Sequence, residues 1–175
     1  MIPHREREAA TLLPAPLLRL HRHSRANLLV LGGTQARRLA VARAFHRRSP
    51  LAGEPMSAID CEREEARLVR ALERWLLACA APEPQPDDPR ERVRVLYLDR
   101  VSALSGVAQR LLLMVAHRMH GDADTGRSPG PARLMAGDRH DLLRATETGR
   151  FSAALADLLD KIRVDLGRRR SRGAA

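Results

Sequence analysis

The sequence has few cysteines, few aromatic residues and no long hydrophobic run, and each shortage excludes a class of protein. Its two cysteines, Cys61 and Cys79, do not lie in a CxxC pair, so neither a disulfide framework nor a structural zinc site is expected. Aromatic residues make up 2% of the chain, which leaves almost no surface on which the bases of single-stranded nucleic acid could stack. No run approaches the ~20 apolar residues of a membrane-spanning helix, and acidic residues and prolines interrupt the N-terminal segment, where a signal peptide is apolar. We therefore expect a cytoplasmic protein with no membrane partner.

Positive charge is the most unusual feature of the composition. The 175 residues include 31 Lys+Arg against 21 Asp+Glu, a formal net charge of +10, and Lys161 is the only lysine. Such an arginine-rich chain attracts polyanions, whether nucleic acid, nucleotide phosphates or an acidic protein surface. Hydrophobic residues make up 44%, which is enough for a core, and the length predicts about one domain.

Short apolar runs alternate with segments of helical periodicity along the chain. The pattern predicts strands over 27–31, 57–60, 93–98, 132–136 and 162–166, and helices over 35–48, 62–80, 104–119, 141–146 and 152–160. Because parallel neighbours need crossover connections, this alternation indicates an α/β domain with a parallel sheet of about five strands, covered on both faces. We predict a helical lead-in over 1–26, the domain over 27–166 and a basic, disordered tail over 167–175.

Two of the predicted strands are followed by residues that suit phosphate or metal binding. In parallel sheets, ligands bind beyond the carboxyl ends of the strands. The first strand leads into LGGTQARR, where a phosphate-binding loop would lie, and the third ends at Asp99, where a magnesium ligand would lie. The predicted nucleotide-binding residues, with Asp99 also the candidate Mg²⁺ ligand, are Gly32, Gly33, Thr34, Arg37, Arg38 and Asp99.

Each of these residues also has a simpler interpretation. The two glycines fit a plain strand-to-helix turn, Arg37 and Arg38 fit solvated charges at a helix start, and Asp99 fits a helix cap or a loop acid. Cys61 fits a buried core position better than a catalytic thiol. The residue pattern alone leaves both interpretations of the loop open.

The order and spacing of these segments resemble the central ATPase domain of bacterial sigma-54-dependent transcription activators, a branch of the AAA+ ATPases. That family has a GESGTGKE-type loop, a helix continuing LVARAIHRxSP and a PFVAVNC strand. This chain has ARAFHRRSP at 42–50 and PMSAIDC at 55–61, while LYLDR at 96–100 and GRF at 149–151 resemble the family's LFLDE strand and GRF turn. The resemblance spans roughly 17–166. It implies a P-loop NTPase-like, three-layer αβα domain, an AAA+ core without its lid subdomain, that binds ATP or ADP with Mg²⁺.

Several departures from the family pattern fall on its catalytic positions. Gln35 and Arg37 stand at two glycine positions of the loop, and Arg38 replaces the phosphate-binding lysine. A side chain at a loop position that needs positive φ is sterically costly, and arginine is not interchangeable with lysine. Arg100 replaces the glutamate that activates the attacking water, and a guanidinium cannot act as a base. The resemblance therefore implies weak or absent nucleotide binding and no hydrolysis.

Other departures concern assembly and partners. The positions of the family's two arginine fingers hold Ser152 and Leu158, and loss of a finger typically lowers the rate by ~10³–10⁵. No GAFTGA loop lies between Cys61 and the third strand, so we expect no direct contact with sigma-54. Neither a lid nor a helix-turn-helix module follows 162–166, so we expect less than a complete activator.

Three functional hypotheses follow. The first is a pseudo-ATPase that regulates transcription by binding another protein, such as an AAA+ subunit or a second copy of itself. The second is a divergent but active ATP-hydrolysing regulator. The third is a basic DNA-binding accessory protein, for which the sequence offers a cluster of tail residues as the candidate contact, namely Arg168, Arg169, Arg170 and Arg172.

Overall fold

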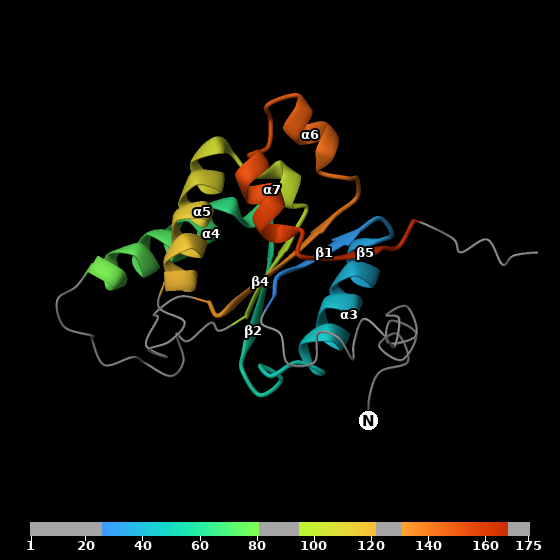
Figure 1. The fold of residues 1–175 in the computed structure, drawn as a ribbon, viewed down its shortest axis with the longest axis horizontal. Coiled ribbons are helices and arrows are strands. Elements are labelled where there is room, and N and C mark those ends of the chain that lie inside the picture. Colours follow the sequence, from blue (N-terminus) through green and yellow to red (C-terminus); the bar gives the residue numbers. More distant parts are fainter. Residues whose placement is uncertain (1–25, 81–94, 122–130, 168–175) are drawn as a thin grey trace, which may run out of the picture.

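The computed structural model describes residues 26–80, 95–121 and 131–167 (Figure 1). The described elements are, in chain order, β1 (Leu28–Leu31), α3 (Gln35–His46), β2 (Met56–Asp60), α4 (Cys61–Ala80), β3 (Val95–Asp99), the 3-10 helix η1 (Val101–Ala103), α5 (Gly106–Gly121), β4 (Arg133–Asp138), α6 (Leu143–Glu147), α7 (Ala153–Leu159) and β5 (Ile162–Asp165). All five predicted strands and all five predicted helices are confirmed. The predicted lead-in over 1–26 and tail over 167–175 lie outside the described residues, except for Ala26 and Gly167.

The strands form one sheet in the order β2-β3-β4-β1-β5, and every neighbouring pair is parallel. The predicted α/β fold with a five-stranded parallel sheet is therefore confirmed. The helix expected from position 104 begins later, at Gly106, after the turn η1. The cause is a cap: the Ser105 hydroxyl accepts a hydrogen bond from the Ala108 N–H at 3.3 Å.

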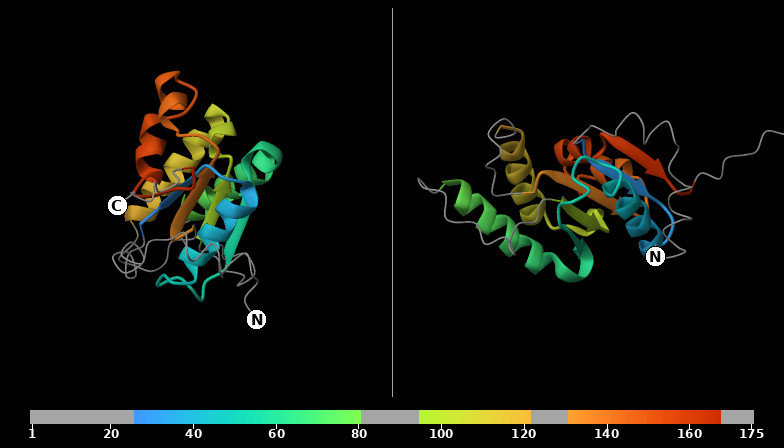
Figure 2. Two further views of the ribbon diagram at one scale, coloured as in Figure 1. Left: turned by 90° about the vertical axis from the view of Figure 1, so that its right-hand side faces the viewer. Right: turned by 90° about the horizontal axis from the view of Figure 1, so that it is seen from below.

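The helices cover both faces of the sheet and make three layers (Figure 2). Alternate residues of each strand point to opposite faces. In β1, Leu28 and Val30 pack with α3 residues on one face, whereas Leu29 and Leu31 pack with α4, α5 and α7 residues on the other. The three central strands β1, β3 and β4 are buried along their whole length, as expected for a sheet sandwiched between helices, whereas the edge strands β2 and β5 are partly exposed.

The carboxyl edge of the sheet is acidic. Each of the four strands β2 to β5 ends in an aspartate, and these residues are Asp60, Asp99, Asp138 and Asp165. The register places Asp60 beside Asp99, and Asp99 beside Gly137. The loop that follows β1 lies at this same edge, because the Gly32 N–H donates to the Asp138 carbonyl at 2.9 Å. Within the described residues, no helix is long and apolar enough to cross a membrane.

Candidate functional site

The loop between β1 and α3 is a tight strand-to-helix turn. Gly32 and Gly33 have φ angles of 76° and 63°, in the left-handed region that favours glycine. Thr34 is the N-cap of α3, and its hydroxyl accepts a hydrogen bond from the Arg37 N–H at 3.3 Å. A Cβ at Gly32 would lie 3.0 Å from the backbone nitrogen of Gly167, so the segment after β5 covers the loop closely. Both the conformation and this close approach require glycine.

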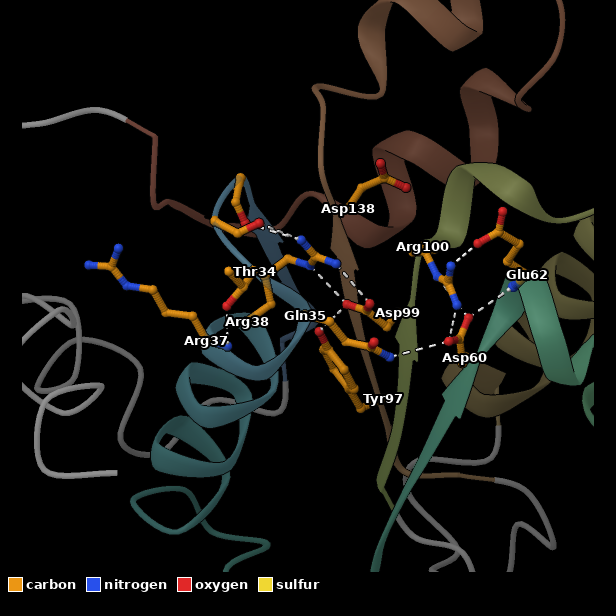
Figure 3. A network of polar contacts seen from close by, with 12 residues as sticks. Thr34, Gln35, Arg37, Arg38, Asp60, Glu62, Tyr97, Asp99, Arg100 and Asp138 are labelled. Atoms are coloured by element: carbon orange, nitrogen blue, oxygen red, sulfur yellow. Dashed lines mark hydrogen bonds and ion pairs between the residues drawn. The ribbon is translucent and has the colours of Figure 1, made fainter. Parts of the chain in front are cut away.

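Arg38, in the first turn of α3, reaches into the sheet edge and pairs with Asp99 (Figure 3). Its Nε and Nη2 donate to the two carboxylate oxygens of Asp99, each at 2.8 Å. Its Nη1 donates to the carbonyl oxygens of Gly32 at 3.3 Å and Gly33 at 3.0 Å. These contacts use four of the five N–H donors of the guanidinium. The side chains of Arg38 and Asp99 are 1% and 3% exposed, so this is a buried, bidentate ion pair.

The surroundings of this pair raise the pKa of Arg38 and of Tyr97. The hydrogen bond to Asp99 is the largest cause that raises the pKa of Arg38, although burial opposes it. The Tyr97 hydroxyl donates to Oδ1 of Asp99 at 2.7 Å. Burial, followed by the negative charge of Asp99, raises the pKa of Tyr97, so the phenol stays a neutral donor. Asp99 therefore accepts from two side chains and is fully engaged inside the protein.

Gly137 of β4 leaves the space that these side chains fill. A Cβ at this position would lie 2.3 Å from the hydroxyl oxygen of Tyr97 and 2.8 Å from Oδ1 of Asp99. Real Cβ atoms do not approach heavy atoms so closely. The residue at 137 is thus part of the site although it contributes no side chain.

Arg100, the residue after β3, forms a second ion-pair cluster at the same edge. Its Nε donates to Oδ1 of Asp60 at 2.9 Å, its Nη2 contacts the other oxygen of Asp60, and its Nη1 pairs with Glu62. Gln35 also donates to Asp60, at 3.3 Å, and so connects this cluster to the start of α3 (Figure 3). Arg100 has a φ of 55° and is the one non-glycine residue with positive φ in the described part of the chain. Arg100 stands where the sequence resemblance implies a glutamate. It is thus a cation, and the carboxylates of Asp60 and Glu62 neutralise its charge.

The structure brings only some of the predicted nucleotide-binding residues together. Gly32, Gly33, Arg38 and Asp99 meet in one cluster, whereas the Arg37 side chain is exposed and points away from it (Figure 3). The interpretation of Arg38 as a solvated charge is wrong, because its side chain is buried and pairs with a carboxylate. The tail arginines, which are Arg168, Arg169, Arg170 and Arg172, lie outside the described residues.

The two positions at which the resemblance implies arginine fingers have local structural contacts. Ser152 is the N-cap of α7, and its own N–H donates to Oε1 of Gln109 at 2.7 Å. Leu158 is partly buried and packs against the core. Cys61 is buried as predicted, and burial raises the pKa of its thiol, so it is not a reactive nucleophile.

Sequence reasoning missed Asp60, Tyr97 and Gly137. Asp60 could have been found from the sequence. The strand that reads PFVAVNC in the sigma-54 activators has an asparagine at this place, and this chain has an aspartate there as well as an arginine at position 100. A second signal was the aspartate at the end of successive predicted strands. Tyr97 lies two residues before Asp99 on β3, so the alternation of side chains along a strand already places both on one face. Gly137 had no such signal, since its role depends on the strand register that places it beside Asp99.

The residues around Asp99 do not fit a magnesium ion in this arrangement. Mg²⁺ needs near-octahedral oxygen ligands, and both carboxylate oxygens of Asp99 already accept from Arg38. Over residues 26–80, 95–121 and 131–167, no group of three or more His, Cys, Asp or Glu side chains is placed to hold a metal ion. A metal would have to displace the guanidinium before it could bind.

Comparison with known proteins identifies the fold. No family model matches the sequence, and no curated protein matches it. Among solved structures, NtrX from Brucella abortus in complex with ATP has a TM-score of 0.63 at 17% identity, over 94% of this chain and 36% of that one. The P-loop NTPase domain of the sigma-54 transport activator from E. coli has a TM-score of 0.53 at 15% identity, over 80% of this chain and 95% of that domain.

A wider similarity extends to replication proteins. The replication initiator DnaA, bound to AMPPCP and single-stranded DNA, has a TM-score of 0.50 at 16% identity, over 90% of this chain and 44% of that one. This chain therefore has a P-loop NTPase-like α/β fold. It spans about a third of the length of NtrX. At these identities the similarity establishes the fold alone.

Proposed function

We propose that this chain is an AAA+-like domain that does not hydrolyse ATP and acts as a regulatory protein-binding domain in transcription. The observation that carries the proposal is the buried ion pair between Arg38 and Asp99. It joins the residue at the phosphate-binding position to the residue at the metal-binding position, so each neutralises the other. The sequence resemblance to the sigma-54-dependent transcription activators supports the link to transcription.

Nucleotide binding would have to compete with this pair. Separating a buried ion pair leaves an uncompensated charge on each side and typically costs about 3–5 kcal/mol. Unless the nucleotide replaced every lost contact, that cost corresponds to a loss of roughly 10²–10⁴-fold in affinity. The carbonyl oxygens of Gly32 and Gly33 also point at Arg38, so an anion that took its place would face two acceptors. We therefore expect weak ATP or ADP binding at most.

Hydrolysis also lacks a base. A general base must accept a proton from water, and the guanidinium of Arg100 is permanently protonated. Asp60 and Glu62 lie nearby but both pair with Arg100, so neither is free to orient water. Arg100, Asp60 and Glu62 at the carboxyl edge of the sheet therefore pair with one another and not with an attacking water.

A regulatory role requires a surface for a partner, and α5 offers one. Val107 and Met114 are 52% and 49% exposed, and they lie seven residues apart on the same face of this helix. The partly buried Leu111 lies between them. An exposed apolar strip of this kind fits contact with another protein, such as a second copy of this chain or an AAA+ subunit.

The decisive test of inactivity is a turnover assay with ATP and Mg²⁺. Phosphate release by the wild-type chain should not exceed that of an Arg38→Ala, Asp99→Ala double variant, because neither protein has a working site. Turnover that Asp99→Ala abolishes would instead establish a divergent active ATPase.

The regulatory part is tested separately by sedimentation velocity over a range of protein concentrations. If α5 mediates self-association, larger species should form and should be lost in a Val107→Ser, Met114→Ser variant. Larger species that persist in this variant would exclude α5 as the contact.

A further inference from the structure

A hollow of about 270 Å³ lies between α6 and α7, and the candidate site does not involve it. Its apolar lining consists of Leu29, Leu142, Leu143, Ala153 and Ala156. Leu29 and Leu142 are buried and so form its floor, whereas Leu143 is 61% exposed. The short helix α6 has no buried residue of its own and projects from the described domain above α7 (Figure 1). Since one water takes up about 30 Å³ of liquid, the hollow has room for a large side chain of a partner.

Carboxylates outnumber cations around the hollow. Asp141, Asp157 and Asp160 line it, and Arg163 is the one cation among its lining residues. Arg163 donates to Asp141 at 2.8 Å and to both oxygens of Asp160 at 3.0 Å, so one guanidinium serves two carboxylates. Asp157 is 83% exposed and pairs at 3.1 Å with Lys161, which lies outside the lining. The two charged residues of α6 do not line the hollow and have opposite signs. The hollow therefore keeps a net negative charge even when both cations are counted.

Helix α5 has the opposite charge and an exposed apolar strip, which consists of Val107, Leu111 and Met114. Val107 and Met114 are 52% and 49% exposed. Met114 lies four residues after Arg110 and four before Arg118, and both arginines are exposed. At 1.5 Å per residue, each arginine is about 6 Å from Met114 along the helix, on a neighbouring turn. No acidic residue occurs in the sequence of α5.

The described domain does not neutralise these two arginines. Nη1 of Arg118 donates to the carbonyl oxygen of Leu76 at 3.3 Å, which leaves its charge unpaired with any carboxylate of the described residues. Arg110 forms no ion pair within the described part of the chain either. Glu73 is an exposed acid on the neighbouring α4, and the structure forms no ion pair between it and either arginine. The strip thus combines exposed apolar side chains with two positive charges.

Within one chain, the strip cannot reach the hollow. Gln109 marks the side of α5 that faces the segment between α6 and α7, because its Nε2 donates to the Arg150 carbonyl at 3.0 Å and its Oε1 accepts from the Ser152 N–H at 2.7 Å. At 3.6 residues per turn, Gln109 lies about 160° around the helix from Val107 and from Leu111. The strip and the hollow are therefore different surfaces of the domain, and they can meet only between two copies.

We propose that the apolar strip of α5 in one copy docks into the hollow between α6 and α7 of a second copy, with Met114 inserted and Arg110 and Arg118 over the carboxylates of the rim. The inference rests on the proposed role of α5 as a contact surface and names its partner. The contact would cover three of the four large hydrophobic side chains that are exposed in the described residues, namely Val107, Met114 and Leu143. Because the two surfaces differ, the contact is heterologous, and copies assemble into a closed ring or an open chain.

Sedimentation velocity of the full chain over a range of concentrations tests this contact with two variants. The strip variant, Val107→Ser with Met114→Ser, lacks the inserted side chains. The hollow variant, Ala153→Arg, places bulk and positive charge in the hollow. Each should raise the dissociation constant at least about tenfold, because each removes one side of every contact. The matched control is Ala154→Arg, at the next residue of α7, which is exposed but outside the lining and should associate like the wild type. Circular dichroism should show that all variants are folded.

Mixing the two defective variants separates a heterologous contact from a two-fold one. An equimolar mixture should form a dimer and nothing larger, because the intact strip of the hollow variant meets the intact hollow of the strip variant and the other two surfaces are defective. A contact between two copies of α5 would instead let the hollow variant associate like the wild type, and the mixture would form no such dimer. That result would overturn this inference and leave α5 as the contact surface.

A charge-reversed variant tests the role of the arginines. Arg110→Glu with Arg118→Glu should weaken association by about tenfold, since like charges would face each other across the contact. The control makes the same change in formal charge at two other exposed arginines, Arg43→Glu with Arg48→Glu, and should have a much smaller effect.

Three further results would overturn the inference. They are a wild type that stays monomeric at every concentration, a hollow variant that behaves like its Ala154→Arg control, and equal losses in the two charge-reversed variants. None of them bears on ATP turnover, so the inactivity proposed above stands or falls by its own assay.

Discussion

Arg38 and Arg100 lie at the same edge of the sheet, and each pairs with an aspartate that ends a strand. The side chains of Arg38 and Asp99 are 1% and 3% exposed, whereas those of Arg100 and Asp60 are 22% and 12% exposed. Water can screen and replace the contacts of the second pair but not those of the first. The comparison shows that two arginine–aspartate pairs at one edge of the sheet lie in different environments, one buried and one partly exposed.

By the sequence resemblance, the buried pair lies where a phosphate and a metal ion are expected to bind, and the partly exposed pair lies where a catalytic base is expected. Arg38 lies between the loop and β3. It donates to both carboxylate oxygens of Asp99, which a bound metal ion would need as ligands, and to the carbonyl oxygen of Gly33. Arg100 pairs with both Asp60 and Glu62 at the carboxyl edge of the sheet. If this contrast is correct, removing a member of the first pair should affect stability far more than removing a member of the second.

The largest effect is expected from Asp99→Ala. This change leaves the charge of Arg38 buried without its partner and should lower the free energy of unfolding by about 3–5 kcal/mol, measured by urea denaturation. Replacing both members, as in Arg38→Met with Asp99→Leu, should cost less than Asp99→Ala alone, because no buried charge remains. Additive losses across the cycle formed by Arg38→Met, Asp99→Leu and their double variant would show that the pair does not act as a unit.

Gly137→Ala should have the next largest effect, by crowding the buried pair without removing any charge. The new Cβ would lie 2.3 Å from the Tyr97 hydroxyl oxygen, and such overpacking typically costs about 1–3 kcal/mol. The matched control is Gly53→Ala, since nothing lies within 4 Å of that position. Adding Tyr97→Phe should recover part of the loss, and no recovery would place the strain elsewhere.

Arg100→Ala should have the smallest effect. The pair is partly solvated, so its loss should cost roughly 1 kcal/mol or less in thermal or urea unfolding. Arg100→Gly should be about 1 kcal/mol more stable than Arg100→Ala, because glycine adopts the φ of 55° without steric penalty. A loss as large as that of Asp99→Ala would remove the contrast between the two pairs.

Most of the fold could be predicted from the sequence. Within the described residues, short apolar runs bounded by glycine, proline and polar residues predicted the five strands, and helical periodicity predicted the five α-helices to within a few residues. The parallel sheet was predicted from the alternation of strands and helices along the chain. Two parallel strands need a crossover connection between them, and this connection is usually a helix. The start of α5 was displaced because a serine cap, Ser105, competes with the hydrophobic periodicity that begins at Leu104.

The composition of the site was predicted better than its geometry. Substitution of the lysine position by Arg38 and of the glutamate position by Arg100 could be read from the aligned motifs. Whether Arg38 would point to solvent, to a phosphate or into the protein could not, because an arginine side chain is long enough for all three. The burial of the pair depends on the register that places Gly137 beside Asp99, which is a property of strands far apart in sequence.

Calorimetric titration of the full chain with ATP and Mg²⁺ tests the central claim most directly, with the Asp99→Ala variant titrated in parallel. If the ion pair between Arg38 and Asp99 closes the site, the wild type will give no saturable heat. Asp99→Ala, which frees Arg38, will bind no more weakly than the wild type. Tight, saturable, magnesium-dependent binding by the wild type that Asp99→Ala abolishes would contradict the account, because it would show that Asp99 serves a bound nucleotide and not Arg38.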